Sequence, residues 1–134
     1  MGLNENDKRT LINLKIERAY ETINEVKSHI EQGFYRTAIN RMYYACYYIV
    51  SALLLQENLD IKTHKGIITL FSLNFIKTGR ISDEFGKFYR NLFELRQTGD
   101  YDEFKVIDKD DVIIRLEPAK QFIGTVEKLI YENQ

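Results

Sequence analysis

The side chain with the clearest chemical potential is an arginine that falls on an otherwise apolar helical stripe. Three apolar residues precede Arg96 at intervals of four, three and four residues: Phe85, Tyr89 and Leu92. An unpaired buried charge is costly, so this guanidinium needs a partner. Asp100 and Tyr101 follow within one helical turn. Either an Arg96–Asp100 pair only ties the helix end to the next loop, or Arg96 contacts a phosphate or ribose at a cleft.

A histidine lies where it could join this arginine. His64 follows Thr63, a good N-cap residue, and falls on the edge of the apolar side of an expected helix. A neutral imidazole accepts a proton near pH 7 and can therefore act as a general base. The segment 62–96 contains seven basic and three acidic side chains, which is a modest indication of anion binding.

A run of tyrosines forms the second unusual segment. Two rows at four-residue spacing share one helix: Tyr43, Tyr44, Tyr47 and Tyr48. Three interpretations stay open. The rings form an aromatic core whose hydroxyls reach the rim, a subunit interface in which tyrosine is common, or a platform on which RNA bases stack.

Other familiar chemistries find no support in the sequence. Cys46 is the single cysteine, and neither a base nor a helix N-terminus lies beside it to activate the thiol, so we expect a buried structural residue. The two histidines and the lack of paired Cys or His–Glu spacing predict no metal site. No glycine-rich phosphate loop is present, and we expect no cofactor.

The composition bounds the fold class and the compartment. The chain has 134 residues, 44% of them hydrophobic, which fits one domain over residues 1–134 with a single core. Nineteen basic and twenty acidic residues exclude a whole-protein field that attracts nucleic acid. One proline and seven glycines favour long helices. The N-terminus lacks the apolar core of a signal peptide and no stretch is long enough to span a bilayer, so we expect a cytoplasmic protein with no membrane association.

Apolar periodicity predicts the helices that position these side chains. The expected helices cover about 7–32, 34–58 and 64–77, then a fourth from Ser82 to Gly99 and a fifth that Asp108 caps. Gly33 is placed to end the first helix, and the acidic segment 100–111 reads as a loop. Pro118 interrupts the last helix without interrupting its stripe, which favours a kink over two helices. The predicted fold is all-α, an up-and-down antiparallel bundle of four main helices plus a short additional helix.

Several motifs, in order along the chain, resemble the HEPN domain superfamily, most of all its small stand-alone prokaryotic members. The motifs lie between about Leu11 and Tyr131: Arg41-Met42-Tyr43-Tyr44-Ala45 with Tyr48, Lys62-Thr63-His64-Lys65-Gly66, Leu70-Phe71, Phe75 to Gly79, and Leu95-Arg96-Gln97-Thr98-Gly99-Asp100-Tyr101. The resemblance implies a helical bundle that is commonly a homodimer and is often paired with a minimal nucleotidyltransferase in a toxin–antitoxin or defence module. It also implies metal-independent cleavage of RNA in many members.

The sequence departs from the nuclease motif of that family, an arginine followed after four to six residues by a histidine. Arg96 matches the arginine, but Tyr101, Asp102 and Glu103 occupy the positions of the histidine. Tyrosine, with a pKa near 10, is a poor base, and an aspartate at its usual pKa is a weak one. His64 can replace the missing histidine only if the fold brings it near Arg96.

Three hypotheses about function follow. The first is a non-catalytic or weakly active HEPN protein that dimerises and binds a nucleotidyltransferase partner, RNA or a nucleotide. The second is an endoribonuclease with a divergent site, and the third is a dimerisation or scaffold module. The candidate catalytic residues are Arg96, His64, Asp100 and Tyr101, and the candidate binding residues are Arg41, Tyr44, Tyr48, Lys65 and Arg90.

Overall fold

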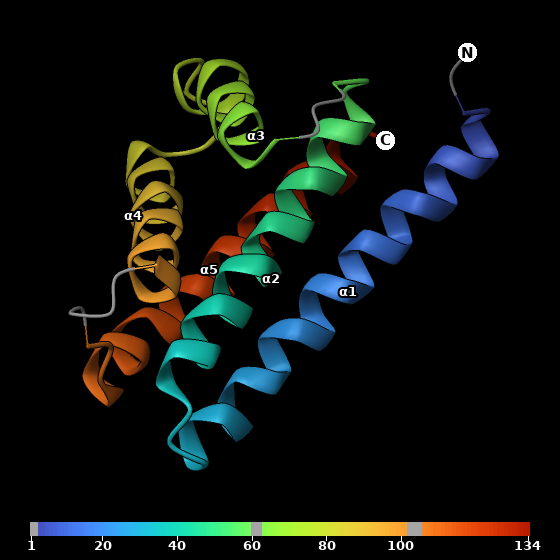
Figure 1. Ribbon diagram of the computed structural model, residues 1–134. Helices are drawn as coiled ribbons and strands as arrows, with labels where there is room; N and C mark the ends of the chain where they lie inside the picture. The colour runs from blue at the N-terminus through green and yellow to red at the C-terminus, as the bar shows by residue number, and fades with distance from the viewer. Residues whose placement is uncertain (1–2, 60–62, 102–105) are drawn as a thin grey trace.

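The computed structural model describes residues 3–59, 63–101 and 106–134, with the backbone alone for 98–101. All regular elements in these ranges are helices, which confirms the all-α prediction: α1 (Glu5–Glu31), α2 (Tyr35–Gln56), α3 (His64–Phe71), the π-helical η1 (Ser72–Ile76), α4 (Asp83–Tyr101) and α5 (Lys109–Glu132). Figure 1 shows α1 and α2 as a long antiparallel hairpin. The short α3 crosses one end, α4 runs back, and α5 returns alongside α2.

The turn between α1 and α2 forms where glycine predicted it. Gly33 has a φ of +78°, and its amide donates to the carbonyl of Ile30 at 3.1 Å. The amide of Phe34 donates to the carbonyl of His29 at 2.8 Å, which completes a Schellman ending of α1. Asn58, with a φ of +60°, occupies the equivalent position after α2. Asparagine tolerates this left-handed conformation better than most side chains do.

Capping side chains fix the starts of α3 and α5, as predicted. The Thr63 hydroxyl accepts a hydrogen bond from the amide of Gly66 at 3.0 Å. The Asp108 and Asp111 carboxylates each accept from the other's amide at 3.0 Å, which makes a capping box. The helix α5 then runs unbroken through Pro118, so the two-helix alternative is excluded.

The structure differs from the prediction in the type of one helical segment and in the end of another helix. The helix that starts at His64 widens into a π-helical turn at Ser72, which periodicity does not reveal. The helix α4 does not end at Gly99 but continues to Tyr101, two residues into the acidic segment in which a loop was predicted. Glycine costs only about 1 kcal/mol inside a helix relative to alanine, and the rest of the fold overrides so small a preference.

The helix α2 lies at the centre of the core, because both of its apolar stripes are buried. It packs against α1, α5 and α4. Ala38, Ala45 and Ala52 are fully buried, as is the thiol of Cys46, whose pKa burial raises. Among the described helices, none has an apolar stretch that could cross a membrane.

Candidate functional site

Aromatic and cationic side chains from three helices gather between α2, α3 and α4. We name this group the tyrosine cluster. Its members are Tyr43, Tyr44, Tyr47 and Tyr48 from α2, His64 from the start of α3, and Tyr89, Phe93 and Arg96 from α4. Helical spacing explains the gathering, because residues three or four apart on α2 and on α4 share one face.

Tyr43 is the centre of the cluster. Its buried ring stacks on the ring of Tyr89, with centroids 5.9 Å apart and planes 8° apart, and lies 5.7 Å from that of Phe93. Its hydroxyl lies 2.6 Å from Nδ1 of His64, a hydrogen bond that joins α2 to α3. Burial raises the pKa of Tyr43, so the phenol stays protonated at neutral pH.

His64 is half-buried against the same rings. Its ring centroid lies 4.8 Å from that of Tyr47 and 5.7 Å from that of Tyr44. Burial, and second the positive charge of Arg96, lower the pKa of His64 below 6.5. The imidazole is therefore neutral at pH 7. The tautomer of His64 decides whether Tyr43 donates or accepts the shared hydrogen bond. The bond uses Nδ1, so Tyr43 does not contact the other ring nitrogen, Nε2, through it.

Arg96 lies over two rings of the cluster. Its Cζ atom is 5.2 Å from the ring centroid of Tyr43 and 5.3 Å from that of Tyr44, both within the range of cation–π attraction. The fold thus brings Arg96 and His64 to the same two tyrosines. Asp100 and Tyr101 lie in the last turn of α4, but their side chains are outside the described residues. The Arg96–Asp100 pair therefore stays a prediction.

Two of the candidate binding residues, Tyr44 and Tyr48, belong to the cluster, and a third, Arg41, adjoins it. Arg41 lies with its Cζ atom 5.2 Å from the ring centroid of Tyr44. The ring centroid of Tyr48 lies 6.2 Å from that of Tyr44. The Cζ atom of Arg18, from α1, lies 5.5 Å from the ring centroid of Tyr48. Two arginines therefore flank the half-exposed edge of the tyrosine rows.

The other two candidate binding residues lie apart from these rings. Lys65 is exposed on α3 directly after His64. Arg90 is exposed on α4 and lines a separate cavity between α3, η1 and α4. Arg90 therefore does not join the other binding residues, because its position on α4 turns it toward η1 rather than toward α2, and its role in binding stays a prediction.

Reasoning from the sequence did not select Tyr43 as a site residue, although it contacts both His64 and Arg96. A usable signal existed, because a tyrosine on a fully buried stripe needs a partner for its hydroxyl. No comparable signal exists for Arg18, whose place over Tyr48 depends on how α1 crosses α2. Tyr89 was expected on the inward stripe of its helix, and it is fully buried there.

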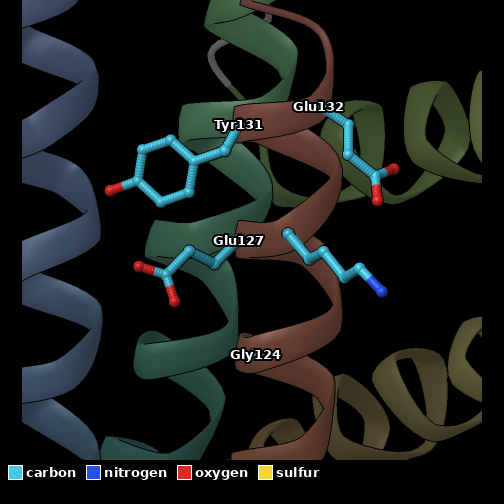
Figure 2. Close-up of a pocket in the computed structure, with 5 residues that line it drawn as sticks. Gly124, Glu127, Tyr131 and Glu132 are labelled. Atoms are coloured by element: carbon cyan, nitrogen blue, oxygen red, sulfur yellow. The ribbon is translucent and has the colours of Figure 1, made fainter.

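A second depression lies on the surface of α5, away from the cluster. Gly124, Glu127 and Tyr131 line it, and Figure 2 shows the last two pointing toward α1 while Glu132 points the other way. The Tyr20 hydroxyl of α1 donates to Glu127 at 2.5 Å. None of the predicted site residues lines this depression. Within the described ranges, moreover, no three metal-ligating side chains gather.

Comparison with known proteins gives consistent matches along the chain. The HEPN domain matches residues 12–129. A UPF0332 protein of Thermotoga maritima is 38% identical over 93% of this chain and 95% of its own length. A protein of Methanocaldococcus jannaschii that is named a putative toxin is 34% identical over 94% of this chain and 93% of its own length. A UPF0332 protein of Archaeoglobus fulgidus is 30% identical over 92% of this chain and 98% of its own length.

The family match spans most of the described helices, from the first turns of α1 to the last turns of α5. It includes the whole tyrosine cluster, and the relatives match over almost their full length. The all-α bundle agrees with the fold that the motifs around Arg41, His64 and Arg96 imply. The chain belongs to the HEPN domain family.

Proposed function

We propose that this HEPN protein acts in a toxin–antitoxin-type module by binding RNA at the tyrosine cluster. The observation that carries the proposal is the convergence of Arg96 and His64 on the rings of Tyr43 and Tyr44. The toxin-type role rests on the HEPN family and on two Methanocaldococcus jannaschii relatives that are named putative toxins.

The chemistry of the cluster suits single-stranded RNA. Guanidinium groups bind phosphate through several hydrogen bonds at once, and the Cζ atoms of Arg41 and Arg96 lie 5.2 and 5.3 Å from the ring centroid of Tyr44. Half-exposed aromatic rings stack on unpaired bases, a contact worth about 1–3 kcal/mol per base. Tyr44 and Tyr48 are half-exposed and adjacent. The proposed complex therefore has phosphates at the arginines and bases on these tyrosines.

Fluorescence anisotropy with a short labelled single-stranded RNA in EDTA tests this binding. Because a hydrogen bond to a charged group contributes about 1.5–3 kcal/mol, Arg96→Gln is expected to raise the Kd roughly tenfold or more. The matched control is Arg9→Gln, an exposed arginine near the start of α1. It should leave the Kd unchanged at the same salt concentration. Equal Kd values for the wild type and a folded Arg96→Gln protein contradict the proposal.

A second candidate function, metal-independent RNA cleavage, is favoured by the neutral His64 beside Arg96. In the tautomer with hydrogen on Nδ1, that N–H donates to Tyr43 and Nε2 is free to act as a base. Nε2 would take the proton of the ribose 2′-hydroxyl while the 2′ oxygen attacks phosphorus. The bond from phosphorus to the 5′ oxygen then breaks, and the 5′ oxygen takes a proton from solvent to leave as a hydroxyl group. Arg96 would stabilise the charge that develops on the phosphate oxygens.

Cleavage of the same RNA in EDTA separates this candidate from binding alone. Loss of cleavage in both His64→Gln and Arg96→Gln supports it, provided that both variants keep the helical circular dichroism of the wild type. Cleavage that persists in either variant contradicts the assignment of these residues. If the wild type does not cleave, the candidate is rejected and the anisotropy result alone decides the proposed function.

The proposal includes two protein partners, a second copy of the chain and a minimal nucleotidyltransferase. The half-exposed tyrosines Tyr44, Tyr47 and Tyr48 favour a subunit interface, where tyrosine is enriched. Light scattering at micromolar concentration is expected to give a dimer, and a monomer contradicts that part. A nucleotidyltransferase encoded in the neighbouring reading frame is expected to co-purify with the chain. If Arg96→Ala lowers stability but changes no binding, a scaffold role replaces RNA binding.

A further inference from the structure

A cavity outside the tyrosine cluster lies between α3, η1 and the first half of α4. Its volume is about 150 Å³, which is room for one ring-sized group but not for a peptide. Its lining includes Phe71 and Tyr89, both fully buried aromatic residues. Tyr89 also stacks on Tyr43, so one ring separates this cavity from the centre of the cluster.

The π-helical turn and a glycine shape this cavity. A Cβ atom on Gly86 of α4 would meet Cγ1 of Ile76 at 3.0 Å, so the end of η1 touches the backbone of α4 there. Ile68 and Ser72 also line the cavity. A π-helical turn carries one more residue than an α turn, and such turns occur frequently at functional sites.

The rim of the cavity is basic while its walls are apolar. Lys87 and Arg90 lie on one side of α4 and line the opening together with Asp83. The Lys87 ammonium lies 3.2 Å from the Asp83 carboxylate, but both side chains are mostly exposed. Such surface pairs contribute about 0–1 kcal/mol, so Lys87 can exchange this partner for a ligand. Apolar walls with a few polar groups at the mouth are typical of small-molecule sites.

We propose that this cavity binds a small aromatic anion, with its ring against Ile68 and Ile76 and its charged group between Lys87 and Arg90. Apolar walls favour the ring, since they remove its surface from water. The two cations favour an anionic substituent at the mouth. This site is distinct from the proposed RNA site, and the buried ring of Tyr89 lies between the two.

Titration of the full chain with phenyl phosphate, followed by two-dimensional NMR of the backbone amides, tests the proposal. We expect saturable shifts at Ser72 and Gly86. Inorganic phosphate, which lacks the ring, is expected to give no saturable shift at these amides. The double variant Lys87→Gln/Arg90→Gln should raise the Kd for phenyl phosphate at least tenfold. Both side chains are exposed, so the variant keeps its fold.

Two comparisons make the result decisive. Lys120→Gln/Arg9→Gln removes the same charges at exposed positions elsewhere and should leave the Kd unchanged. Arg96→Gln should also leave it unchanged, because phenyl phosphate bound at the tyrosine cluster would depend on Arg96 instead. Affinity that falls in Arg96→Gln, or that survives the loss of Lys87 and Arg90, overturns the proposal. Neither outcome depends on the RNA affinity of the wild type, so the failure of this proposal and the failure of the proposed function can be distinguished.

Discussion

The helix α2 packs in different ways against α1, its partner in the hairpin, and against α4 at the site. Against α1, α2 forms the most extensive helix–helix contact of the described chain. The buried stripe of α1 is almost wholly aliphatic: Ile12, Ile16, Ala19, Ile23 and Val26. Against α4, α2 presents Tyr43 to the rings of Tyr89 and Phe93. The first interface is mainly aliphatic and serves stability, with the Arg18 guanidinium over Tyr48 as its polar contact. The second holds a hydroxyl, an imidazole and a guanidinium and can do chemistry.

The largest expected effect breaks the aliphatic interface. Ile23→Ala, at a position that is 3% exposed, should lower the free energy of unfolding by about 3 kcal/mol, since it removes buried methylenes and leaves a cavity. Urea unfolding measures this. Leu14→Ala, on the same helix but 54% exposed, should change stability little. A large loss of RNA affinity in folded Ile23→Ala would contradict the division of roles between the two interfaces.

A smaller effect is expected in the aromatic interface. Tyr43→Phe keeps the ring but removes the hydroxyl that bonds Nδ1 of His64, and should cost about 1 kcal/mol in urea unfolding. The nitrogen chemical shifts of His64 should change, because its tautomer loses the group that fixes it. Tyr131→Phe, at an exposed position, is the control for removal of a phenol. Unchanged His64 shifts would show that the hydrogen bond does not form in solution.

The helix α1 also makes a polar contact, a hydrogen bond from Tyr20 to Glu127 of α5, which tests whether polar groups outside the aromatic interface affect function. Tyr20→Phe removes the hydroxyl that donates to Glu127 of α5 and should lower the free energy of unfolding by about 0.5 kcal/mol, because the pair is only half-buried. A double-mutant cycle with Glu127→Gln measures the coupling. RNA affinity should not change in either variant. A change would mean that α1 and α5 contribute to function as well.

The smallest expected effect is a pH dependence that comes from the aromatic interface. Because the pKa of His64 is lower in the folded state than its unfolded value of about 6.5, the unfolded chain binds the proton first as pH falls. His64 therefore adds no pH dependence above that value and destabilises the fold progressively below it. The urea midpoint should fall less below pH 6.5 in His64→Gln than in the wild type. An equal fall of the midpoint in both proteins would contradict the assignment of this pH dependence to His64.

Most of the fold was predictable from local pattern. Each helix is specified by residues that are close to one another in the sequence. Examples are the apolar stripe of α1, the two stripes of α2 and the capping residues Gly33, Thr63 and Asp108. The prediction failed at Ser72 and Gly99, where local preference is weak. A π-helical turn and a glycine inside a helix both depend on what the neighbouring helices allow.

The sequence by itself determined the helices, the buried centre of α2, the resemblance to the HEPN family and the candidacy of Arg96 and His64. These properties follow from residue type and spacing within single helices. Only the tertiary structure decided that His64 and Arg96 share Tyr43 and that Arg90 lines a different cavity. The physical reason is that these contacts join different helices. Their distances depend on how α3 crosses the bundle and how α4 packs on α2, which no spacing along one helix encodes.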